Sequence, residues 1–502
     1  MAKIQHITIL GGGTSGWLSA AILSYQFRHQ PVRITLVESE QIGTIGVGEA
    51  TIPPFLDVLS SIGIDQFDFI RQTQSTFKLG IRFSGWLEQT DAYMHPFGQL
   101  GQPLFHQDFY QCWLKSYQAG NNSPLMAHSP AAVLAEAGGF MMPAMVKNHP
   151  MQASAYALHI DATLAARYFR NHAEKLGVER VEGRVEQVLC HENGHVSQLL
   201  LSDGSAVGGQ LFLDCSGFSA LISGQTLGAE FEDWSEFLTV NEAVTIQSEP
   251  FPEPPSYTES KAQAYGWSWH IPLQHRTGNG YVYDNRYIDS ESAAQTLLEQ
   301  LPTPPLSDPR RIRFRTGIRP SPWLGNCVAI GLAAGFLEPL ESTAIHMVTR
   351  GVKHLLRLLP DRAFNPVLQE EYNRRMRRDF EEIRDFLVLH YCKNQRSDSE
   401  FWCYYQRMNL PERLEKKLTL FEENGGLIPG EDDLFTANNW YAVLEGLRVR
   451  PRRMSPLSED IPVTRLEPLL QQIRQSLTDG ARAMPSHRAF IDQHCPATKP
   501  GM

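Results

Sequence analysis

The first forty residues carry the clearest pattern of apolar and polar positions in the chain. An apolar run at 4–10 is followed by a glycine-rich hexapeptide at 11–16, and residues 17–27 then place apolar side chains at helical spacing. A β-branched run at 32–37 ends at the acidic residue Glu38. Strand, glycine turn, helix, strand and acid in this order predict a βαβ unit that binds a dinucleotide.

The rest of the chain predicts strands in its middle part and helices behind them. Residues 50–150 follow neither the helical nor the strand period, no internal repeat is present, and beyond about residue 470 the pattern assigns no element. Hydrophobic periodicity and turn residues predict helices at 161–177, 380–390 and 411–421, and strands at 178–189, 196–201, 211–214, 265–271 and 280–288.

This order of strands and helices predicts that the chain has two parts. Residues 1–360 are expected to form an interrupted, Rossmann-like nucleotide-binding module with an inserted, substrate-facing sheet region. Residues 361–502 are expected to form a mainly helical region that covers the substrate. The predicted fold class is α/β, with a mixed-sheet part and a C-terminal helical subdomain.

Composition and charge narrow the class of protein. The 502 residues are 42% hydrophobic, which is enough for a large core, and the net charge of −10 argues against a nucleic-acid binder. Seven scattered cysteines without CxxC or Cys/His spacing predict reduced thiols and no metal site. The start of the chain lacks a signal-peptide pattern, and the longest uncharged apolar stretch, 327–337, is too short to cross a bilayer. We therefore expect a soluble, cytoplasmic protein without a membrane partner.

A basic run at 374–378 is the one feature that could suggest a nucleic-acid site. Arg378 and Glu382 are four residues apart, and Asp379 and Glu381 follow the run closely. Spacing of this kind is typical of a solvated helix face with internal ion pairs. We prefer that interpretation.

The glycine-rich hexapeptide matches the GxGxxG pattern. Gly11 permits a tight turn, Gly13 lets the backbone approach a pyrophosphate, and Gly16 allows close contact between helix and strand. The N–H groups of this segment, which includes Thr14 and Ser15, would face the phosphates. Glu38, with Ser39 beside it, suits the ribose hydroxyls of an unphosphorylated adenosine, so this unit fits FAD and NAD equally.

Two further glycine-rich segments favour FAD. Residues 42–50, which contain Val47, Glu49 and Ala50, form a loop that can lie flat against a ring system. Residues 327–335 predict a strand that turns into a helix, although a buried strand followed by small-residue helix packing explains the same pattern. Two backbone cradles so far apart suit a cofactor with a dinucleotide end and a distant isoalloxazine.

Five motifs are spread along the chain: GGGTSGW at 11–17, GVGEATIP at 46–53, TFK at 76–78, WSWHIP at 267–272 and EPLEST at 338–343. Together they resemble the flavin-dependent halogenases of the tryptophan halogenase type. GxGxxG is shared by many flavoproteins, whereas WxWxIP combined with EPLEST is highly specific. The resemblance extends from residue 1 to roughly 445.

The resemblance implies that reduced FAD and oxygen convert chloride or bromide to hypohalous acid, which then reaches an electron-rich, indole-like aromatic substrate held away from the flavin. A separate flavin reductase would supply FADH2, because the chain shows no second dinucleotide unit. The resemblance is also compatible with a homodimer. It assigns flavin contacts to Val185, Leu332 and Ile345, and related aromatic hydroxylases carry Asp where Leu332 stands.

Lys78 and Glu341 are the catalytic candidates that the resemblance gives. Lys78 lies in an alternating segment in which 77, 79, 81 and 83 are apolar, so an ordinary solvated lysine is the competing interpretation. As a family residue, it would donate a hydrogen bond to hypohalous acid or form a haloamine. Glu341 would orient the oxidant or take the proton from the ring; alternatively, it is an acid favoured by a helix N-terminus.

The remaining site residues also follow from the resemblance. Backbone N–H groups of Thr343 and Ala344 would bind halide, and Ala344 stands where tryptophan-specific members carry Gly. His95 and Phe97 would line the aromatic pocket, although a satisfied loop histidine is an equal alternative. Trp267 and Trp269 would share one strand face and separate the substrate from the flavin, or simply belong to the core.

Three hypotheses result. The leading one is an FADH2-dependent halogenase that acts on an aromatic compound. The alternative is an FAD-dependent aromatic monooxygenase on the same scaffold. A third is a flavin-binding protein without catalysis, which the combination of Lys78 and Glu341 disfavours.

Overall fold

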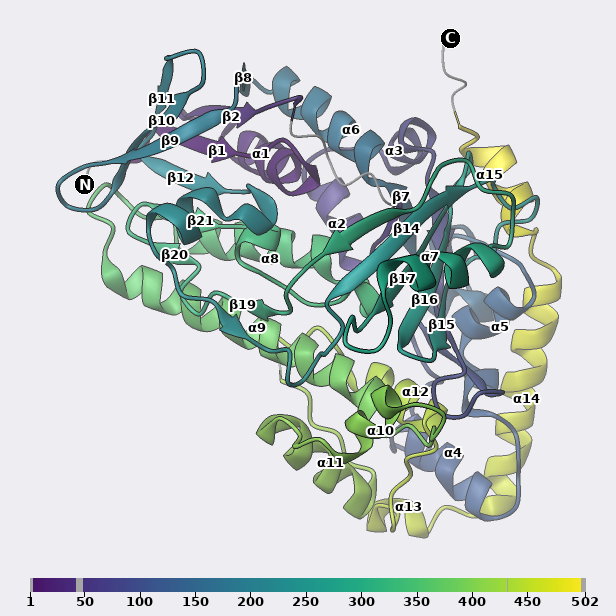
Figure 1. The fold of residues 1–502 in the computed structure, drawn as a ribbon. Coiled ribbons are helices and arrows are strands. Elements are labelled where there is room, and N and C mark those ends of the chain that lie inside the picture. The colour runs from purple at the N-terminus through teal and green to yellow at the C-terminus, as the bar shows by residue number, and fades with distance from the viewer. Residues whose placement is uncertain (1–2, 42–47, 431, 498–502) are drawn as a thin grey trace.

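Two large sheets and a set of long helices make up the fold (Figure 1). The structure is a computed structural model that describes residues 3–41, 48–430 and 432–497. A six-stranded sheet lies at one side of the molecule and a seven-stranded sheet at the other. Below the first sheet, α9 (Pro366–Cys392) runs diagonally across the view towards the helices under the second.

The six-stranded sheet confirms the predicted dinucleotide-binding scaffold. In spatial order its strands are β20 (Trp323–Leu324), β21 (Cys327–Ala329), β12 (Leu211–Asp214), β1 (His6–Leu10), β2 (Arg33–Glu38) and β8 (Glu179–Glu182). All neighbours are parallel except β20 and β21. Helix α1 (Thr14–Phe27) starts directly after the glycine-rich turn and packs against α6 (Ala162–Lys175). This is a Rossmann-type α/β arrangement.

The seven-stranded sheet combines strands from two separate segments of the chain. In spatial order its strands are β18 (Arg310–Arg313), β14 (Glu242–Ser248), β17 (Thr277–Tyr283), β16 (Gly266–Pro272), β15 (Thr258–Gln263), β5 (Gly80–Ser84) and β6 (Ala92–Pro96). Only β15 and β5 pair in parallel. The strand predicted at 265–271 is confirmed as β16, whereas the one predicted at 280–288 starts earlier and ends at Tyr283. Helix α7 (Ser290–Glu299) covers β14 and β17.

A small sheet connects the two large ones and carries Lys78. It consists of β3 (Gly48–Ala50), β7 (Ala157–Asp161) and β4 (Thr76–Lys78), all antiparallel. After β4, the Leu79 N–H donates to the Ser256 carbonyl oxygen at 2.7 Å, and the chain passes into β5 of the seven-stranded sheet. The alternation at 77–83, which is that of a single strand, therefore extends over two strands in different sheets. Lys78 in β4 is buried, whereas Arg82 in β5 is exposed.

Two other predicted elements differ from the observed ones. The segment 178–189 contains two strands in different sheets, because the Gly183 N–H between them donates to the carbonyl oxygen of Glu38. The segment 327–335 turns from strand β21 into only a single 3-10 turn, η6 (Gly331–Ala333), since Gly335 already pairs with Ile318 in a strand. The other smaller elements are β9 (Val185–Cys190), β10 (Val196–Leu201), β11 (Ala206–Gly208), β13 (Glu232–Asp233), β19 (Gly317–Ile318), β22 (Gly335–Phe336) and η7 (Pro339–Glu341).

Helices form the rest of the fold, and two of them lie where the pattern assigned no element. Beyond residue 470, most of α14 (Val463–Arg482) and all of α15 (His487–His494) are helical. Their buried side chains, among them Leu477 and Phe490, pack on earlier parts of the chain, and this tertiary packing defines them. The other helices are α2 (Pro54–Ser61), α3 (Gln66–Thr73), α4 (Phe109–Gln118), α5 (Pro130–Glu136), α8 (Ala344–Arg357), α10 (Glu400–Arg407), α11 (Glu412–Asn424), α12 (Ala437–Gly446) and α13 (Pro456–Glu459).

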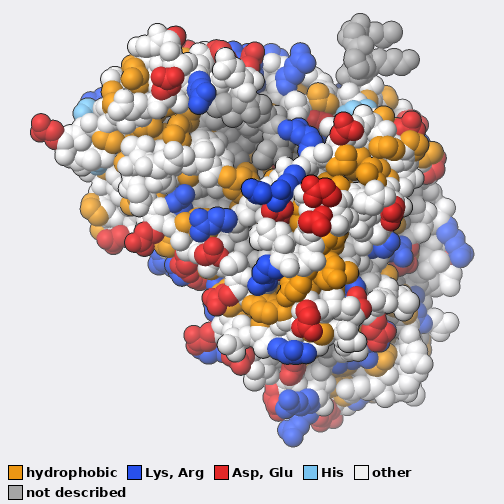
Figure 2. All heavy atoms as spheres, viewed as in Figure 1, with side chains coloured by type: hydrophobic (Ala, Val, Ile, Leu, Met, Phe, Trp, Pro, Cys, Tyr) orange, Lys and Arg blue, Asp and Glu red, His pale blue; other side chains and the backbone are white. Residues whose placement is uncertain are grey.

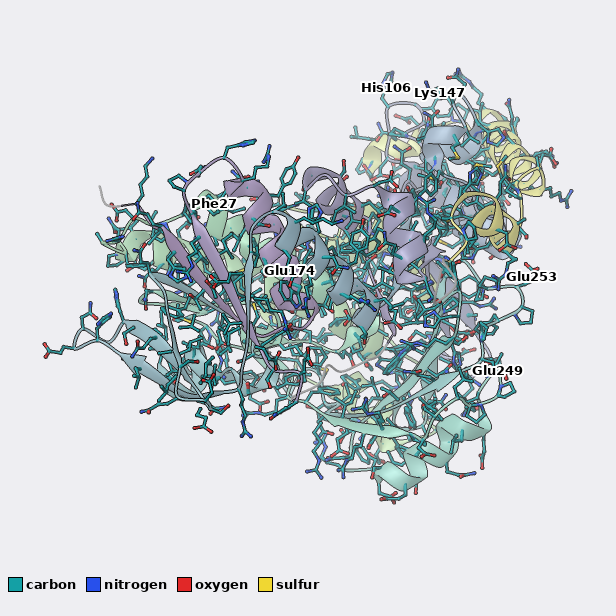
Figure 3. All side chains as sticks on the ribbon, turned by 90° about the horizontal axis from the view of Figure 1, so that it is seen from above. Phe27, His106, Lys147, Glu174, Glu249 and Glu253 are labelled. Atoms are coloured by element: carbon teal, nitrogen blue, oxygen red, sulfur yellow. The ribbon has the colours of Figure 1, made fainter. Side chains whose placement is uncertain are left out.

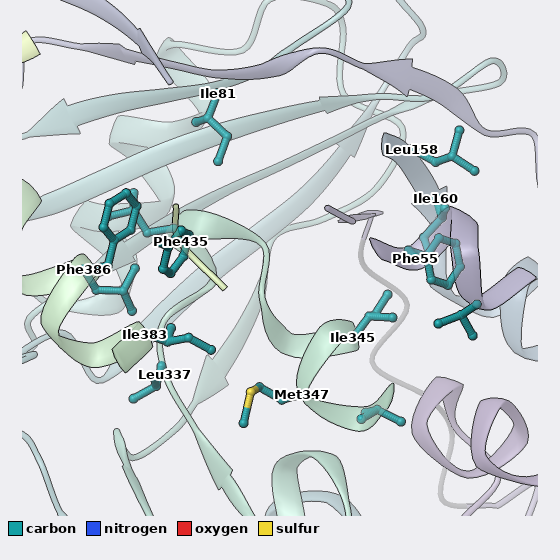
Figure 4. Close-up of a cluster of buried hydrophobic side chains, with 14 of the residues drawn as sticks. Phe55, Ile81, Leu158, Ile160, Leu337, Ile345, Met347, Ile383, Phe386 and Phe435 are labelled. Carbon is teal, nitrogen blue, oxygen red and sulfur yellow. The ribbon is translucent and has the colours of Figure 1, made fainter. Parts of the chain in front are cut away.

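One hydrophobic core extends through both halves of the molecule. Figure 4 shows Phe386 and Phe435 face to face at one side and Phe55 at the other, with Ile345 and Met347 of α8 between them. Seen from above, the ends of α1 and α6 lie far from the loops that carry His106 and Lys147 (Figure 3). Helix α8 thus links the nucleotide-binding part to the aromatic region around Phe386.

Candidate active site

A cavity of about 830 Å³ lies between the six-stranded and the seven-stranded sheet. Figure 2 shows the molecule hollowed between these two parts. Gly16 is behind the cavity wall, and Val47 falls outside the described residues. The sequence-predicted cofactor and halide residues that line the cavity are Gly11, Gly13, Thr14, Ser15, Glu38, Ser39, Glu49, Ala50, Val185, Leu332, Thr343, Ala344 and Ile345.

The glycine-rich turn leaves room for a phosphate group. Gly11 has a φ of 116°, and a Cβ there would lie 2.2 Å from the Cys215 carbonyl oxygen. A Cβ on Gly16 would lie 1.8 Å from the Gly11 carbonyl oxygen, so helix and strand touch at this position. A Cβ on Gly13 would meet nothing within 4 Å. The first N–H groups of α1 face this open space, which fits a pyrophosphate.

Glu38 lies at the end of β2, as predicted, and protein groups hold it. Its carboxylate pairs with Arg180 at 2.5 Å and accepts a hydrogen bond from the Trp17 indole at 3.2 Å. Arg170, which also lines the cavity, is 3.5 Å away. Basic side chains and an indole N–H thus hold the Glu38 side chain at the wall of the cavity.

Lys78 is completely buried, so the solvated-lysine interpretation is wrong. Its Nζ donates hydrogen bonds to the Ser342 hydroxyl at 2.8 Å and to the Thr51 carbonyl oxygen at 3.3 Å, and it lies 5.2 Å from the centre of the Phe97 ring. Burial lowers the pKa of Lys78 from its ordinary value to about 7, although the carboxylate of Glu341 opposes the shift. A lysine with this pKa is available both as an ammonium and as a free amine.

Ser342 connects Lys78 to the cavity, and sequence reasoning did not single it out. Its hydroxyl accepts from Lys78, while the residue also lines the cavity. Its backbone adopts the left-handed conformation with a φ of 59°, between η7 and α8. A left-handed backbone at a non-glycine residue is uncommon and often marks a functional site.

Glu341 lies between two imidazoles, and it also belongs to the first turn of the short helix η7. Nδ1 of His95 is 2.9 Å and 3.0 Å from its two oxygens, and Nε2 of His390 is 2.8 Å from Oε1. Burial acts to raise the pKa of Glu341, but attraction to His95 and hydrogen bonds from both imidazoles outweigh it and lower the pKa to about 2. The carboxylate is therefore ionised within an apolar region.

Both ring nitrogens of His95, predicted either to line the aromatic pocket or to be a satisfied histidine, have polar neighbours. The ring is buried, its Nδ1 faces Glu341, and its Nε2 lies 2.9 Å from the Asn439 side-chain nitrogen. On the other side, the Tyr93 hydroxyl lies 2.9 Å from Nδ1 of His390. Sequence reasoning missed these partners, because they come from β6, α9 and α12, which no local motif relates.

The N-terminus of α8 faces the cavity. Thr343 is the N-cap of this helix, and its side chain forms no capping hydrogen bond. The first backbone N–H groups of a helix have no partners within it and carry partial positive charge. The stretch Thr343–Ile345 thus offers donors to an anion in the cavity.

Two tryptophans of β16 form part of the cavity wall. Trp267 and Trp269 both line the cavity, and their rings lie 5.7 Å apart. The indole N–H of Trp267 donates to the Glu338 carboxyl at 3.2 Å, and the Tyr391 hydroxyl donates to the same oxygen at 2.7 Å. Burial raises the pKa of Glu338 to about 7. The wall is therefore held by hydrogen bonds as well as by packing.

The described part of the chain contains neither a metal-binding cluster nor a membrane-spanning helix. Within 3–41, 48–430 and 432–497, no cluster of three or more His, Cys, Asp or Glu side chains could hold a metal ion. None of the helices in these ranges combines the length and hydrophobicity needed to span a membrane.

Comparisons with known proteins agree with this geometry. The family model described as tryptophan halogenase matches residues 6–462. The structure of BrvH, a flavin-dependent halogenase from Brevundimonas sp. BAL3, is 39% identical, with a TM-score of 0.94 over 98% of this chain and 100% of that one. Xcc4156, a flavin-dependent halogenase from Xanthomonas campestris, is 40% identical, with a TM-score of 0.95 over 99% and 100%.

A curated relative extends the same comparison. The tryptophan 7-halogenase RebH of Lentzea aerocolonigenes is 32% identical over 98% of this chain and 99% of its own length. These findings confirm the predicted fold class and the predicted enzyme, a halogenase that uses FADH2 and halide, and they favour it over the hydroxylase alternative. The chain belongs to the tryptophan halogenase family.

Proposed function

We propose that this halogenase places chlorine or bromine on an electron-rich, indole-like aromatic compound, with Lys78 and Glu341 as its catalytic residues. One observation carries the assignment. Lys78 has its amine buried, close to Glu341, and hydrogen-bonded to Ser342, which itself lines the cavity. An oxidant formed in the cavity would therefore meet the amine before it met solvent.

FAD would occupy the cavity, with its pyrophosphate over the glycine-rich turn and its ribose near Glu38. When bound, reduced FAD would supply two electrons to oxygen and halide would supply two more, which gives oxidised FAD, hypohalous acid and water. The protein contributes the open space beside Gly13, the N–H groups of α1 and the enclosed walls formed by β16. Val185, Leu332 and Ile345 line the same space and are proposed flavin contacts.

Halide would bind at the N-terminus of α8. The backbone N–H groups of Thr343 and Ala344 lie at this end, which favours an anion. Ala344 adds a methyl group that the glycine of tryptophan-specific relatives lacks. The larger bromide ion is compatible with such a site, and we propose that both halides are accepted.

Lys78 would deliver the halogen. As an ammonium it polarises hypohalous acid by donating a hydrogen bond, and as a free amine it attacks the halogen, forms an N–halogen bond and releases water. A pKa of about 7 keeps both forms populated near neutral pH. The Phe97 ring lies beside the amine and would keep water away from the hypohalous acid bound there.

Glu341 would act on the aromatic ring. Electrophilic attack leaves a positive charge on the ring carbons, which an ionised carboxylate in an apolar region stabilises strongly. The same carboxylate can then take the proton from the carbon that received the halogen. With a pKa of about 2, Glu341 is a carboxylate near neutral pH. It can therefore stabilise positive charge on the ring or take up the ring proton without first having to release a proton of its own.

An aromatic substrate fits the side chains around these two residues. The rings of Phe386 and Phe435 stack with their centres 3.8 Å apart, and His95 lies 5.5 Å from Phe386. Leu434 and Phe97 belong to a small apolar cluster on the Lys78 side. An indole or phenol of similar size would complete this aromatic region.

A flavin reductase is the partner that the family requires, and we further propose a cytoplasmic location and a homodimer. All seven cysteines are free, as expected in a reducing compartment. Analytical ultracentrifugation of the purified chain tests the dimer, because a monomer and a dimer of this chain differ clearly in sedimentation coefficient.

The decisive experiment combines purified protein, a flavin reductase, FAD, NADH, bromide and indole. We expect mass spectra with the isotope pair of bromine for wild type and none for Lys78→Ala, while both proteins bind FAD equally. Lys261→Ala, at an exposed position of the seven-stranded sheet, is the matched control and should halogenate normally. Wild-type product yield from Lys78→Ala would refute the assignment, and a mass gain of one oxygen would favour hydroxylation.

A further inference from the structure

The N-terminus of α12 fixes how the side chain of Asn439 is oriented. The backbone N–H of Thr436 lies 2.8 Å from Asn439 Oδ1, and the Thr436 hydroxyl lies 2.9 Å from the same atom. A backbone N–H can only donate, so the atom that faces it must be the amide oxygen. The amide nitrogen Nδ2 consequently points the other way, towards His95.

This orientation determines the protonation of His95. Nδ2 of Asn439 lies 2.9 Å from Nε2 of His95, and an amide NH2 group can only donate. Nε2 must therefore offer its lone pair and carry no proton. The proton of the neutral imidazole then lies on Nδ1, which is 2.9 Å from Oε2 and 3.0 Å from Oε1 of Glu341.

We propose that Asn439 is a positioning residue that sets the tautomer of His95 and thereby keeps Glu341 ionised. If the proton of His95 were on Nε2, the lone pair of Nδ1 would face the carboxylate of Glu341. Only a protonated Glu341 could then donate a hydrogen bond to Nδ1. A protonated Glu341 could neither stabilise the cationic ring nor accept its proton. The inference rests on the proposed role of Glu341, but the tautomer itself does not.

The other groups that face Glu341 are consistent with this arrangement. Nε2 of His390 on α9 lies 2.8 Å from Oε1, and the Tyr93 hydroxyl can donate to Nδ1 of the same ring. Lys78 on β4 is the neighbouring cation, and it lowers the energy of the carboxylate from a greater distance. None of these groups contacts Nε2 of His95, so Asn439 alone controls that nitrogen among the described contacts.

The test is ¹⁵N NMR of protein labelled at histidine, with His95→Gln used to assign the His95 signals. In wild type we expect Nε2 to show the shift of an unprotonated nitrogen and Nδ1 that of a protonated one. Asn439→Asp keeps the oxygen that caps α12 but places a carboxylate against Nε2, so both nitrogens should become protonated. A protonated Nε2 in wild type, or an unchanged His95 in Asn439→Asp, would overturn the proposal.

Asn438→Asp is the matched control, because it adds the same charge one residue away on the same helix. It should leave the His95 signals and the halogenation rate at their wild-type values. Asn439→Asp should lower kcat by about 10–100-fold, a range common for residues that orient a catalytic group, with unchanged FAD binding and an unchanged melting temperature. If His95 behaves as expected while Glu341→Gln halogenates normally, the tautomer stands and the role proposed for Glu341 fails.

Discussion

The amine of Lys78 donates a 2.8 Å hydrogen bond to the hydroxyl of Ser342, a residue that also faces the large cavity. The two residues are 264 positions apart and come from β4 and from the turn between η7 and α8. Because the amine is buried, this hydroxyl is its link to the space in which the oxidant would form. The reactive amine thus lies between the large cavity and the buried interior of the protein.

Replacing Ser342 separates its hydroxyl from its backbone conformation. Both Ser342→Ala and Ser342→Gly remove the shorter of the two hydrogen bonds that Lys78 donates. We expect both to lose halogenation activity about tenfold or more, since small displacements of reacting groups are costly. Ser342→Gly should be the more stable variant by about 1 kcal/mol, because glycine tolerates a φ of 59°. Urea unfolding and initial rates with bromide measure the two effects. Full activity of either variant would show that the hydroxyl is dispensable.

Activity should change with pH around the pKa of Lys78. Below about pH 7 the side chain is mainly an ammonium, and above it mainly a free amine. Single-turnover halogenation should therefore show an inflection near pH 7. A rate that rises through it identifies the amine as the reacting form, whereas a falling rate identifies the ammonium. Lys78→Arg, which stays charged throughout, should lack the inflection; an identical profile for this variant would assign it to another group.

The buried carboxyl of Glu338 makes stability depend on pH. Its pKa is raised to about 7 in the folded protein by burial, so folded chains hold a proton that unfolded chains release at lower pH. The free energy of unfolding should consequently fall as pH rises from about 4.5 to about 7. Glu338→Gln has no carboxyl to ionise at this position, so its stability should not fall in this way. It should be more stable than wild type at pH 8 by about 1–3 kcal/mol, since one pKa unit corresponds to about 1.4 kcal/mol.

Urea unfolding at pH 5 and pH 8 checks that expectation. The exposed Glu236→Gln is the control for loss of one negative charge. If Glu338→Gln were less stable than wild type at both pH values, the hydrogen bonds to Trp267 and Tyr391 would need the ionised carboxylate.

The glycine-rich turn offers two substitutions with opposite consequences. Alanine usually stabilises a helix relative to glycine by about 1 kcal/mol, but Gly16→Ala would push a methyl group into the Gly11 carbonyl oxygen at 1.8 Å. We expect this variant to lose stability. Gly13→Ala has open space and should keep the wild-type melting temperature while its methyl group weakens FAD binding. Thermal unfolding without FAD and fluorescence titration with FAD distinguish the two; unaltered FAD affinity of Gly13→Ala would argue against a phosphate at this position.

Local patterns were sufficient for the nucleotide-binding part of the fold. The turn, β1, α1 and β2 follow from residues close in sequence, because a glycine turn and two apolar runs leave few alternatives. The family motifs then pointed to Lys78 and Glu341. Periodicity alone misplaced Lys78, since it cannot reveal that Leu79 carries the chain from one sheet into another.

The contacts of Glu341 were not predictable in the same way. His390 lies in the last turn of a long helix, and Asn439 lies next to a buried tryptophan; neither belongs to a recognisable pattern. Their importance arises only when α9, α12 and β6 meet around one carboxylate. Hydrogen bonds between residues hundreds of positions apart depend on tertiary packing, which periodicity does not encode.

Helix α15 has a consequence for how the enzyme is made. Its first residue, His487, accepts a hydrogen bond from the backbone N–H of Phe77, the immediate neighbour of Lys78, and Phe490 packs against the Phe77 ring. The backbone beside the reactive lysine therefore gains this support only after helix α15 has been synthesised, 410 positions later in the chain. A polypeptide that has already formed its nucleotide-binding part would be unable to direct the oxidant until α15 has docked.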